Sequence, residues 1–320
     1  MKTIRAGLAV LGLCLIQSVS AASYPQRPIT MVVPFAAGGG TDVLARVVAE
    51  RMTAKLKTSV VVDNRPGASA QIGTRHVVEA PADGYTLLVA TNSLVTGPFL
   101  FSSLPYDAAR DLRPVVSMAD LPIFLAVSSR HEVRTLQEFV TLAKNGAGKL
   151  NYGSAGPGTT LHMAAEWLKR NAGFEATHIP FKGSGVAVGA LGAGHVDFNM
   201  ENLGAVQPMA ASGRVRLLAV ASPKRHPSEP DVPTMGESGL PDVNLATWVF
   251  LMAPAGTPDE AVELLNKTVN DILREDAVRE QLLKQGFVVT GGTPDDVLDR
   301  MAREAELWGG VIKAAHITAQ

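Results

Sequence analysis

The sequence predicts an α/β protein of two lobes, each a mostly parallel sheet flanked by helices. Short apolar runs that end in small-residue loops alternate with amphipathic stretches, which is typical of strand–loop–helix units. The alternation begins at residue 29 and restarts after an apolar stretch at residues 122–128. We expect lobe 1 to comprise residues 23–123 and 222–320, and lobe 2 residues 124–221, with crossing strands between them.

The expected elements follow one another along the chain. In the first lobe we expect strands at residues 29–34, 60–62 and 85–90, and helices at 41–55 and 71–79. The second lobe is expected to hold a crossing strand at 122–128, further strands at 150–154, 178–181, 196–200 and 216–221, and helices at 135–144, 159–171 and 186–191. Residues 246–253 are expected near the hinge, and residues 260–285 and 294–313 as closing helices.

The first 22 residues have the features of a cleavable signal peptide. Lys2 and Arg5 form a basic start, residues 6–16 form an apolar run, and small residues precede a cleavage site near Ala21 or Ala22. A membrane anchor is the alternative, but this run is shorter than the about 20 residues that a bilayer requires. We therefore predict export to the periplasm.

Cys14 is the only cysteine, and it lies inside the predicted signal peptide. A lipoprotein is the other interpretation of this cysteine, but Leu13 is bulky where a lipoprotein signal has a small residue. If the signal peptide is cleaved near Ala21 or Ala22, the mature chain lacks disulfides, thiolate nucleophiles and cysteine metal ligands. It would carry 27 basic and 30 acidic residues, a net charge of about −3, which does not indicate binding to nucleic acid or anionic membranes.

Three strand exits share one design, at residues 35–41, 154–160 and 181–185. In each, glycines allow a close approach of the backbone, and a helix N-terminus follows, with unpaired N–H groups and partial positive charge. One such loop could simply be a turn and a cap. Three of them in two facing lobes predict a clamp that closes on an anion. A carboxylate suits such amides as well as a phosphate does, and the P-loop pattern is absent.

Enzyme motifs are weak. There is no Gly-x-Ser-x-Gly elbow, and the second histidine of a metalloprotease motif does not follow His131-Glu132. Asp197 and Glu201 could form an acid/base pair with His162, but one structural carboxylate and one near the cleft is the plainer interpretation. We expect no catalytic residues, no metal and no cofactor.

Motifs along the whole mature chain resemble those of one family. They are Tyr24-Pro25-x-Arg27-Pro28-Ile29, Val33-Pro34-Phe35-x-x-Gly38-Gly39-x-x-Asp42, Asn64-Arg65-Pro66-Gly67-Ala68, Asp83-Gly84-Tyr85-Thr86-Leu87, Tyr152-Gly153-Ser154-Ala155-Gly156-x-Gly158-Thr159-x-x-His162, Lys182-Gly183-Ser184, Asp231-Val232-Pro233-Thr234-x-x-Glu237-Ser238-Gly239 and Ala253-Pro254-Ala255-Gly256-Thr257-Pro258. This set is similar to the substrate-binding receptors of tripartite tricarboxylate transporters, also called the Bug family. The resemblance implies a monomeric, two-lobed periplasmic binding protein of type II-like fold, which delivers a small carboxylate to the membrane subunits of a transporter. A ligand sensor with a signalling partner would need the same clamp, so that alternative stays open.

The resemblance also implies which residues hold the ligand, mostly through main-chain groups. Carried onto this sequence, they are Phe35, Ala37, Gly38, Thr91, Asn92, Ser93, Ser154, Ala155, Gly156, Thr159, His162, Lys182 and Gly183. Glu201 stands before Asn202 where an aspartate is common, and residues 66–70 have fewer glycines than the family usually has. We expect Glu201, if it enters the cleft, to repel a second carboxylate. Family ligands include di- and tricarboxylates, acidic amino acids and aromatic acids.

Overall fold

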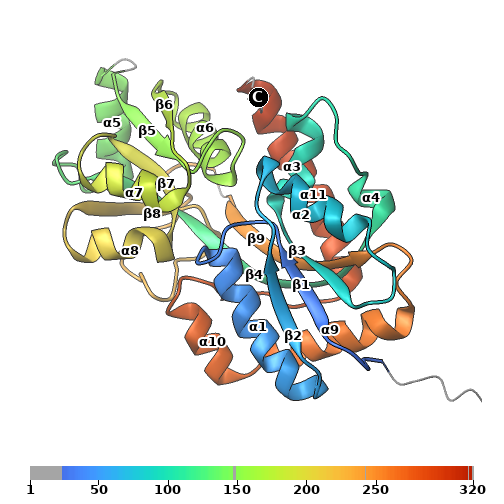
Figure 1. The fold of residues 1–320 in the computed structure, drawn as a ribbon. Coiled ribbons are helices and arrows are strands. Elements are labelled where there is room, and N and C mark those ends of the chain that lie inside the picture. Colours follow the sequence, from blue (N-terminus) through green and yellow to red (C-terminus); the bar gives the residue numbers. More distant parts are fainter. Residues whose placement is uncertain (1–23, 147–148, 242, 316, 319–320) are drawn as a thin grey trace, which may run out of the picture.

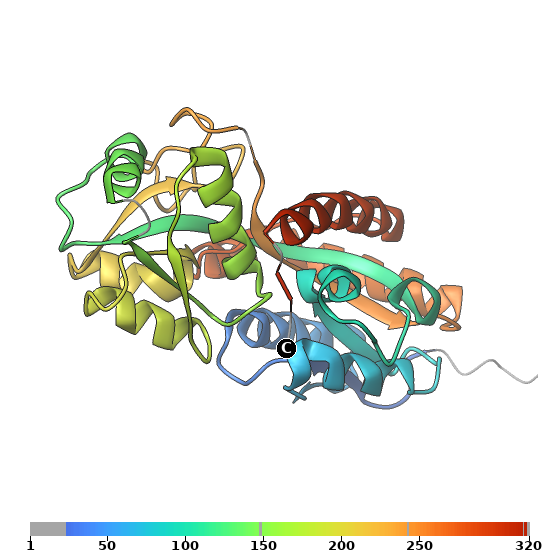
Figure 2. The same cartoon turned by 90° about the horizontal axis from the view of Figure 1, so that it is seen from above.

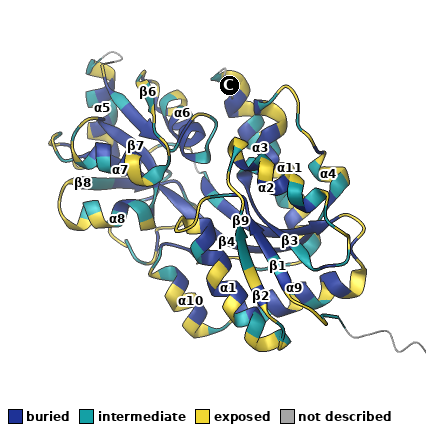
Figure 3. Cartoon of the chain, viewed as in Figure 1, coloured by how far each residue is buried: buried dark blue, intermediate teal, exposed yellow. Residues whose placement is uncertain are grey.

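The computed structural model describes residues 24–146, 149–241, 243–315 and 317–318. The predicted signal peptide, with Cys14 and the cleavage site near Ala21 or Ala22, lies outside the described residues. Two α/β lobes lie side by side (Figure 1, Figure 2), as the fold class predicted. The strands are largely buried, and exposed residues gather on the outer faces of the helices (Figure 3). No helix among the described residues has the length and apolar character to cross a bilayer.

The first lobe is built on three parallel strands in the order β2-β1-β3. These are β1 (Ile29–Val33), β2 (Val60–Asn64) and β3 (Thr86–Thr91). One core joins β1 to α1 (Gly40–Leu56), α9 (Asp259–Leu273) and α10 (Asp276–Leu283), and another joins it to α2 (Gln71–Val78) and α3 (Asn92–Leu100). Because both faces are covered, the strand is apolar at nearly every position.

The second lobe repeats this plan with the parallel order β7-β5-β6. Its strands are β5 (Asn151–Ser154), β6 (Thr177–Pro180) and β7 (Phe198–Asn202). The helices are α5 (Leu136–Gly146) and α6 (Thr160–Ala172), whose core includes Tyr152 and Phe198, and α7 (Ser184–Gly192) and α8 (Leu203–Ala211), whose core includes Val188 and Val206.

Long antiparallel strands join the lobes. In β4 (Leu112–Ser128), residues 112–122 pair with β9 (Ala246–Pro254), and residues 123–128 pair with β7 and β8 (Val215–Val220). The sheets are therefore mixed, parallel in the outer strands and antiparallel at the crossing. The crossing strand is longer than the predicted residues 122–128, because Asp120 and the prolines around it interrupt the apolar pattern. Asp120 is accommodated by an ion pair with Arg300 at 2.8 Å.

Several helices differ from the prediction. Helices α3, α8 and the short α4 (Ala108–Asp111) were not predicted from the sequence. The helix expected at residues 260–285 is two helices, α9 and α10, which are followed by the short strand β10 (Val288–Val289). The last helix, α11 (Pro294–Ala314), places Val297 in a core of the first lobe and Trp308 in the core of the second. It therefore bridges both lobes. The lobe boundaries at residues 123/124 and 221/222 stay a prediction.

Candidate functional site

A cavity of about 400 Å³ lies where the loops of the two lobes meet. None of its lining side chains carries a charge. The first lobe contributes Phe35, Ala36, Ala37, Gly39, Gly40, Thr41, Ser69, Thr91, Ser93 and Thr96. The second lobe and the crossing contribute Ala155, Gly158, Thr159, Thr160, Leu161, Gly183, Ser184, Asn202 and Thr247. The cavity therefore offers main-chain groups and neutral hydroxyl or amide side chains between short apolar surfaces.

Two helices from opposite lobes begin at this cavity directly after a glycine, which has no side chain to cap them. The residue that precedes α1 is Gly39, and the residue that precedes α7 is Gly183. Neither glycine has a side chain that could accept a hydrogen bond from the first N–H groups of its helix, so those N–H groups stay available. By contrast, Thr91 caps α3 and Thr159 caps α6 through their side chains. The cavity is thus flanked by two free helix N-termini, which attract anions.

The loop before α1 is fixed by Asp42. The N–H of Gly38, which has φ of +83°, donates to Asp42 Oδ2 at 2.9 Å. Arg46 Nε and Asn64 Nδ2 donate to the same carboxylate at 3.0 and 2.9 Å, and Asn64 also donates to Phe35 O. Burial by itself would raise the pKa of Asp42, but the bonds from Arg46, Gly38 and Asn64 outweigh it and hold the pKa below its ordinary value. Gly38 therefore shapes the loop, because its own N–H is already used.

The loop before α6 is supported from behind by stacked histidines. The N–H of Gly158 donates to His162 Nδ1 at 3.0 Å, and the ring of His162 stacks on that of His178 with centroids 3.9 Å apart. Ser154 Oγ lies 2.7 Å from His178 Nε2. Burial, and then the neighbouring His178, lower the pKa of His162 to about 4. His162 is therefore neutral at pH 7, and it positions the loop instead of lining the cavity.

The other predicted residues divide into those at the cavity and those elsewhere. Asn92 does not line the cavity: it is fully buried, donates to Glu304 Oε2 and accepts from the Trp248 N–H, both at 2.8 Å, and so ties α3 to α11 and β9. Lys182 is exposed and outside the lining. The predicted residues that line the cavity are Phe35, Ala37, Thr91, Ser93, Ala155, Thr159 and Gly183, and those that lie next to it are Gly38, Ser154, Gly156, His162 and Glu201.

The alternative acid/base pair does not form. Asp197 lies just before β7 and accepts from Arg130, His131 and the Asn151 N–H at 2.5 to 2.7 Å. Glu201 lies about 13 Å further along the strand, given about 3.3 Å per residue. It is fully buried behind Ser184 instead of projecting into the cleft. Among the described residues, no three His, Cys, Asp or Glu side chains converge as metal ligands would.

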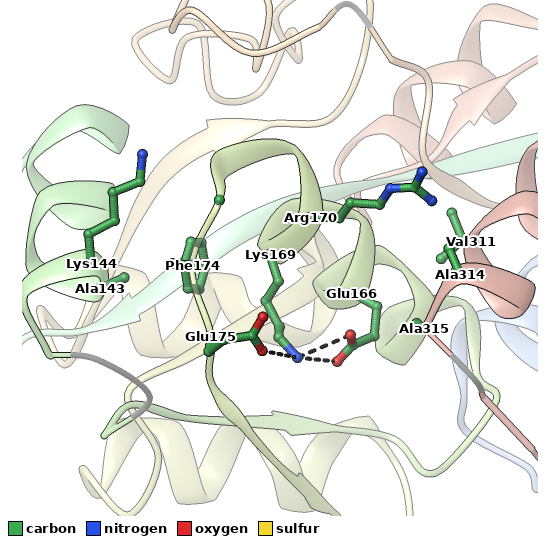
Figure 4. Close-up of a pocket in the computed structure, with 11 residues that line it drawn as sticks. Ala143, Lys144, Glu166, Lys169, Arg170, Phe174, Glu175, Val311, Ala314 and Ala315 are labelled. Atoms are coloured by element: carbon green, nitrogen blue, oxygen red, sulfur yellow. Dashed lines mark hydrogen bonds and ion pairs between the residues drawn. The ribbon is translucent and has the colours of Figure 1, made fainter.

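A larger hollow of about 1130 Å³ lies between helices α5 and α6 of the second lobe and the C-terminal end of α11 (Figure 4). Lys169 is directed to Glu166, at 2.8 and 3.0 Å, and to Glu175, whereas Lys144 and Arg170 point away from this cluster. This hollow is open and its central charges neutralise one another. It receives none of the strand-exit loops, so the interlobe cavity is the better candidate site.

Comparison with known proteins identifies the family. Residues 44–317 match the family described as "Tripartite tricarboxylate transporter family receptor". The chain belongs to this receptor family. Protein BugT of Bordetella pertussis is 38% identical over 313 residues, which cover 96% of each chain. The solved structure of R. palustris Rpa4515 with adipate is 36% identical, with a TM-score of 0.85 over 92% of this chain and 99% of that one. MatC (Rpa3494) from Rhodopseudomonas palustris with bound malate is 31% identical, with a TM-score of 0.80 over 90% and 100%.

Members of this family are periplasmic solute-binding receptors of the two-lobed fold, as the sequence predicted. Twelve lining residues were not among the predicted ligand-binding residues: Ala36, Gly39, Gly40, Thr41, Ser69, Thr96, Gly158, Thr160, Leu161, Ser184, Asn202 and Thr247. Ser184 and Asn202 lay within or beside motifs that carried the resemblance, so a signal existed for them. Thr96 and Thr247 reach the cavity only through tertiary structure, and no local pattern marks them.

Proposed function

We propose that this protein is an exported receptor that captures a small organic carboxylate between its lobes and delivers it to the membrane subunits of a tripartite transporter. One observation carries the proposal: the uncapped N-termini of α1 and α7 approach one uncharged cavity from opposite lobes. A carboxylate that accepts N–H bonds from both helices would hold the lobes together.

The magnitudes favour an anion without requiring lysine or arginine. A helix N-terminus stabilises a negative charge by about 0.3–1 kcal/mol when exposed and up to about 2 kcal/mol when partly buried. Hydrogen bonds to an ionised acceptor contribute roughly twice as much as neutral ones. A cationic ligand would meet two positive helix ends with no lining carboxylate, which disfavours simple amines.

The size of the cavity supports a small ligand. Its volume of about 400 Å³ is near the lower end of the about 300–1,000 Å³ that is usual for small-molecule sites. The relatives solved with adipate and with malate support a dicarboxylate among the candidates. The lining hydroxyls of Thr41, Thr91 and Thr159 can bind either a second carboxylate or a ligand hydroxyl, because a hydroxyl both donates and accepts.

A thermal-shift screen of adipate, malate, citrate, glutamate and benzoate tests the proposal. At 100 times its dissociation constant, a ligand adds about 2.7 kcal/mol to the free energy of unfolding, which should raise Tm by several degrees. We expect at least one acid to do so, with one ligand bound per chain and recovered unchanged. If every acid leaves the Tm of folded protein unchanged, or if the bound acid is converted to a product, the proposed function is wrong.

Export has its own test. Expression of the full chain with its first 22 residues should give periplasmic protein that begins near Ala22 or Ser23. Mass spectrometry of the periplasmic fraction identifies that end. Retention of the N-terminal segment on protein held at the membrane would instead support an anchor.

A further inference from the structure

Glu201 is a fully buried carboxyl directly behind the ligand cavity. It lies near the end of β7, and its Oε1 accepts a bond from the Asn202 N–H at 3.1 Å and is hydrogen bonded to Ser184 Oγ. Its Oε2 has no hydrogen-bond partner among the residues that the structure describes. Ser184 and Asn202 both line the cavity, so Glu201 is one side chain away from the ligand.

Among the residues that the structure describes, no cation is paired with this carboxyl. The elements packed on β7 are β4, β5, α6, α7 and α8, of which α7 and α8 contain no titratable side chain. Phe124 of β4 pairs with Glu201, and the buried ring of His226 contacts the ring of Phe124; burial lowers the pKa of His226. Neither His226 nor any of the titratable or charged groups on β4, β5 and α6 is bonded to Glu201. The titratable or charged groups on β4, β5 and α6 are Arg113, Asp120, Tyr152, His162, Glu166, Lys169 and Arg170.

Burial therefore decides the state of Glu201. It raises the pKa to about 8, although the bonds from Ser184 and Asn202 act in the opposite direction. At pH 7 the carboxyl is neutral and carries a proton. A neutral buried carboxyl also avoids the cost of an uncompensated charge in the protein interior.

The proton of Glu201 determines what Ser184 can offer to a ligand. When Glu201 is protonated, its hydroxyl can donate to Ser184 Oγ, which leaves the serine proton free to donate into the cavity. When Glu201 is ionised, it is an acceptor only, and Ser184 must donate to it. The serine then presents only lone pairs to the ligand, beside a buried negative charge.

We propose that protonated Glu201 is a specificity-determining positioning residue, which acts through Ser184 to make the α7 end of the cavity a site for an anionic oxygen. The inference rests on the proposed carboxylate receptor and deepens it. A carboxylate at this end disfavours the ionised form of Glu201, because two negative charges would lie close together. Binding an acid and keeping this proton are therefore coupled, and Glu201 acts from behind the wall, unlike the sequence-based picture of a carboxylate within the cleft.

Calorimetric titrations with adipate, malate, citrate and benzoate at pH 6.5, 7.5, 8.5 and 9.5 test this coupling. For wild type we expect constant affinity up to pH 7.5 and then a loss that approaches tenfold per pH unit, because one proton is coupled. Glu201→Gln, whose amide can donate permanently to Ser184, should bind as wild type does at pH 7.5 and show no such loss. Ser184→Ala should bind more weakly at pH 7.5 and show a smaller loss at high pH, because the serine donor is absent and only the repulsion between the two negative charges remains.

The control variant is Glu175→Gln, which removes a carboxylate whose side chain is 85% exposed on the outer side of the second lobe. It should keep the wild-type pH profile. Circular dichroism at each pH verifies that every variant is folded. An unchanged profile in Glu201→Gln, or a flat profile in wild type, overturns the inference.

A second readout needs no ligand. Infrared difference spectra of wild type minus Glu201→Gln should contain the carbonyl band of a protonated carboxylic acid at pH 7 and lose it by pH 9.5. If this band is absent at pH 7, Glu201 is ionised and the inference is wrong even if acids bind. If the band is present but no acid binds at any pH, the proposed function has failed, and the coupling fails with it.

Discussion

The two walls of the cavity offer the same donor, an uncapped helix N-terminus, but are supported by different chemistry. In the first lobe, Asp42 is ionised and bonded to Arg46, whose side chain is 53% exposed. In the second lobe, His162 and Glu201 are buried and neutral at pH 7. The charged group, Asp42, has a partner that reaches solvent, Arg46. The neutral groups, His162 and Glu201, have no ion-pair partner among the described residues. The second wall should therefore lose stability as pH falls, through His162, and lose ligand affinity as pH rises, through Glu201. The first wall should not show both effects.

The largest effect should come from closing the second wall with Gly183→Val. Gly183 has φ of +106° and open space around the position of a Cβ, so a branched side chain would be strained and would occupy that space. We expect at least about a hundredfold loss of acid affinity, since both the α7 N–H groups and the cavity are blocked, equivalent to about 2.7 kcal/mol. Calorimetry measures the affinity, and Gly38→Val tests the first wall indirectly, because Gly38 shapes the loop before α1 and does not line the cavity.

Gly239→Val is the matched control for strain. Gly239 has φ of +88° and open space at its Cβ, but it does not line the cavity. It should lower Tm to a similar extent and leave affinity unchanged. Equal affinity losses in Gly183→Val and Gly239→Val would show that strain, not the cavity, is responsible.

The next largest effect is the acid sensitivity of the second wall. Because the folded pKa of His162 is about 4, the unfolded chain binds a proton below its ordinary pKa of about 6.5 and the folded chain does not. The free energy of unfolding should therefore fall as pH decreases from 6.5 towards 4, by about 2–3 kcal/mol. Urea unfolding at pH 7 and pH 4.5 measures this. His162→Gln should lose less stability over that interval, and an equal loss in both proteins would exclude His162 as the source.

The first wall should behave differently over the same interval. The lowered pKa of Asp42 means that its stabilising contribution is present above its ordinary pKa and is lost only as pH falls through the lower, folded value. At pH 7, Asp42→Asn should reduce the free energy of unfolding by about 1–2 kcal/mol, because Gly38 and Arg46 lose an ionised acceptor. Asp271→Asn, in an exposed pair with Lys267, should change it much less, because solvent screens that pair. Equal effects of the two variants would remove the special role of Asp42.

The smallest effect concerns the strained loop beside the first wall. Ala68, Ser69 and Ala70 all have positive φ, at positions where the family resemblance implied glycine. Ala68 is exposed, so Ala68→Gly should stabilise the protein by up to about 1 kcal/mol through relief of this conformation. Ala109→Gly, in the short helix α4, should instead destabilise the protein by about 0.5–1 kcal/mol. Chemical denaturation of the two variants resolves this difference.

The sequence predicted the strands better than the helices between them. Apolar runs marked β1, β5 and β7 to within two residues at most of their ends, and glycine-rich turns follow β1 and β5. Helices α3 and α8 were not predicted, because each contains a proline, Pro98 or Pro208, and few polar residues that would give a helical period. The split between α9 and α10 at Arg274 and Glu275 has no glycine or proline to mark it.

Part of the site could be predicted from the sequence and part could not. The strand-exit loops could be predicted, because glycine and threonine at those positions carry a local signal. The roles of the side chains behind the loops could not be predicted. Whether His162 faces a ligand or a backbone N–H, and whether Glu201 enters the cavity or lies behind Ser184, depends on side-chain direction and burial. Those are set by the tertiary arrangement of α6, α7 and β7.

The central claim is that two uncapped helix N-termini hold a carboxylate without a charged side chain in the cavity. Calorimetric titration of wild type at pH 7 with the acid that raises its Tm most, and with the amide of that acid, tests it most directly. The account predicts one acid bound per chain and an amide at least about a hundredfold weaker, because the amide lacks the charge that the N–H groups and helix dipoles stabilise. Equal affinity for the acid and its amide would contradict it.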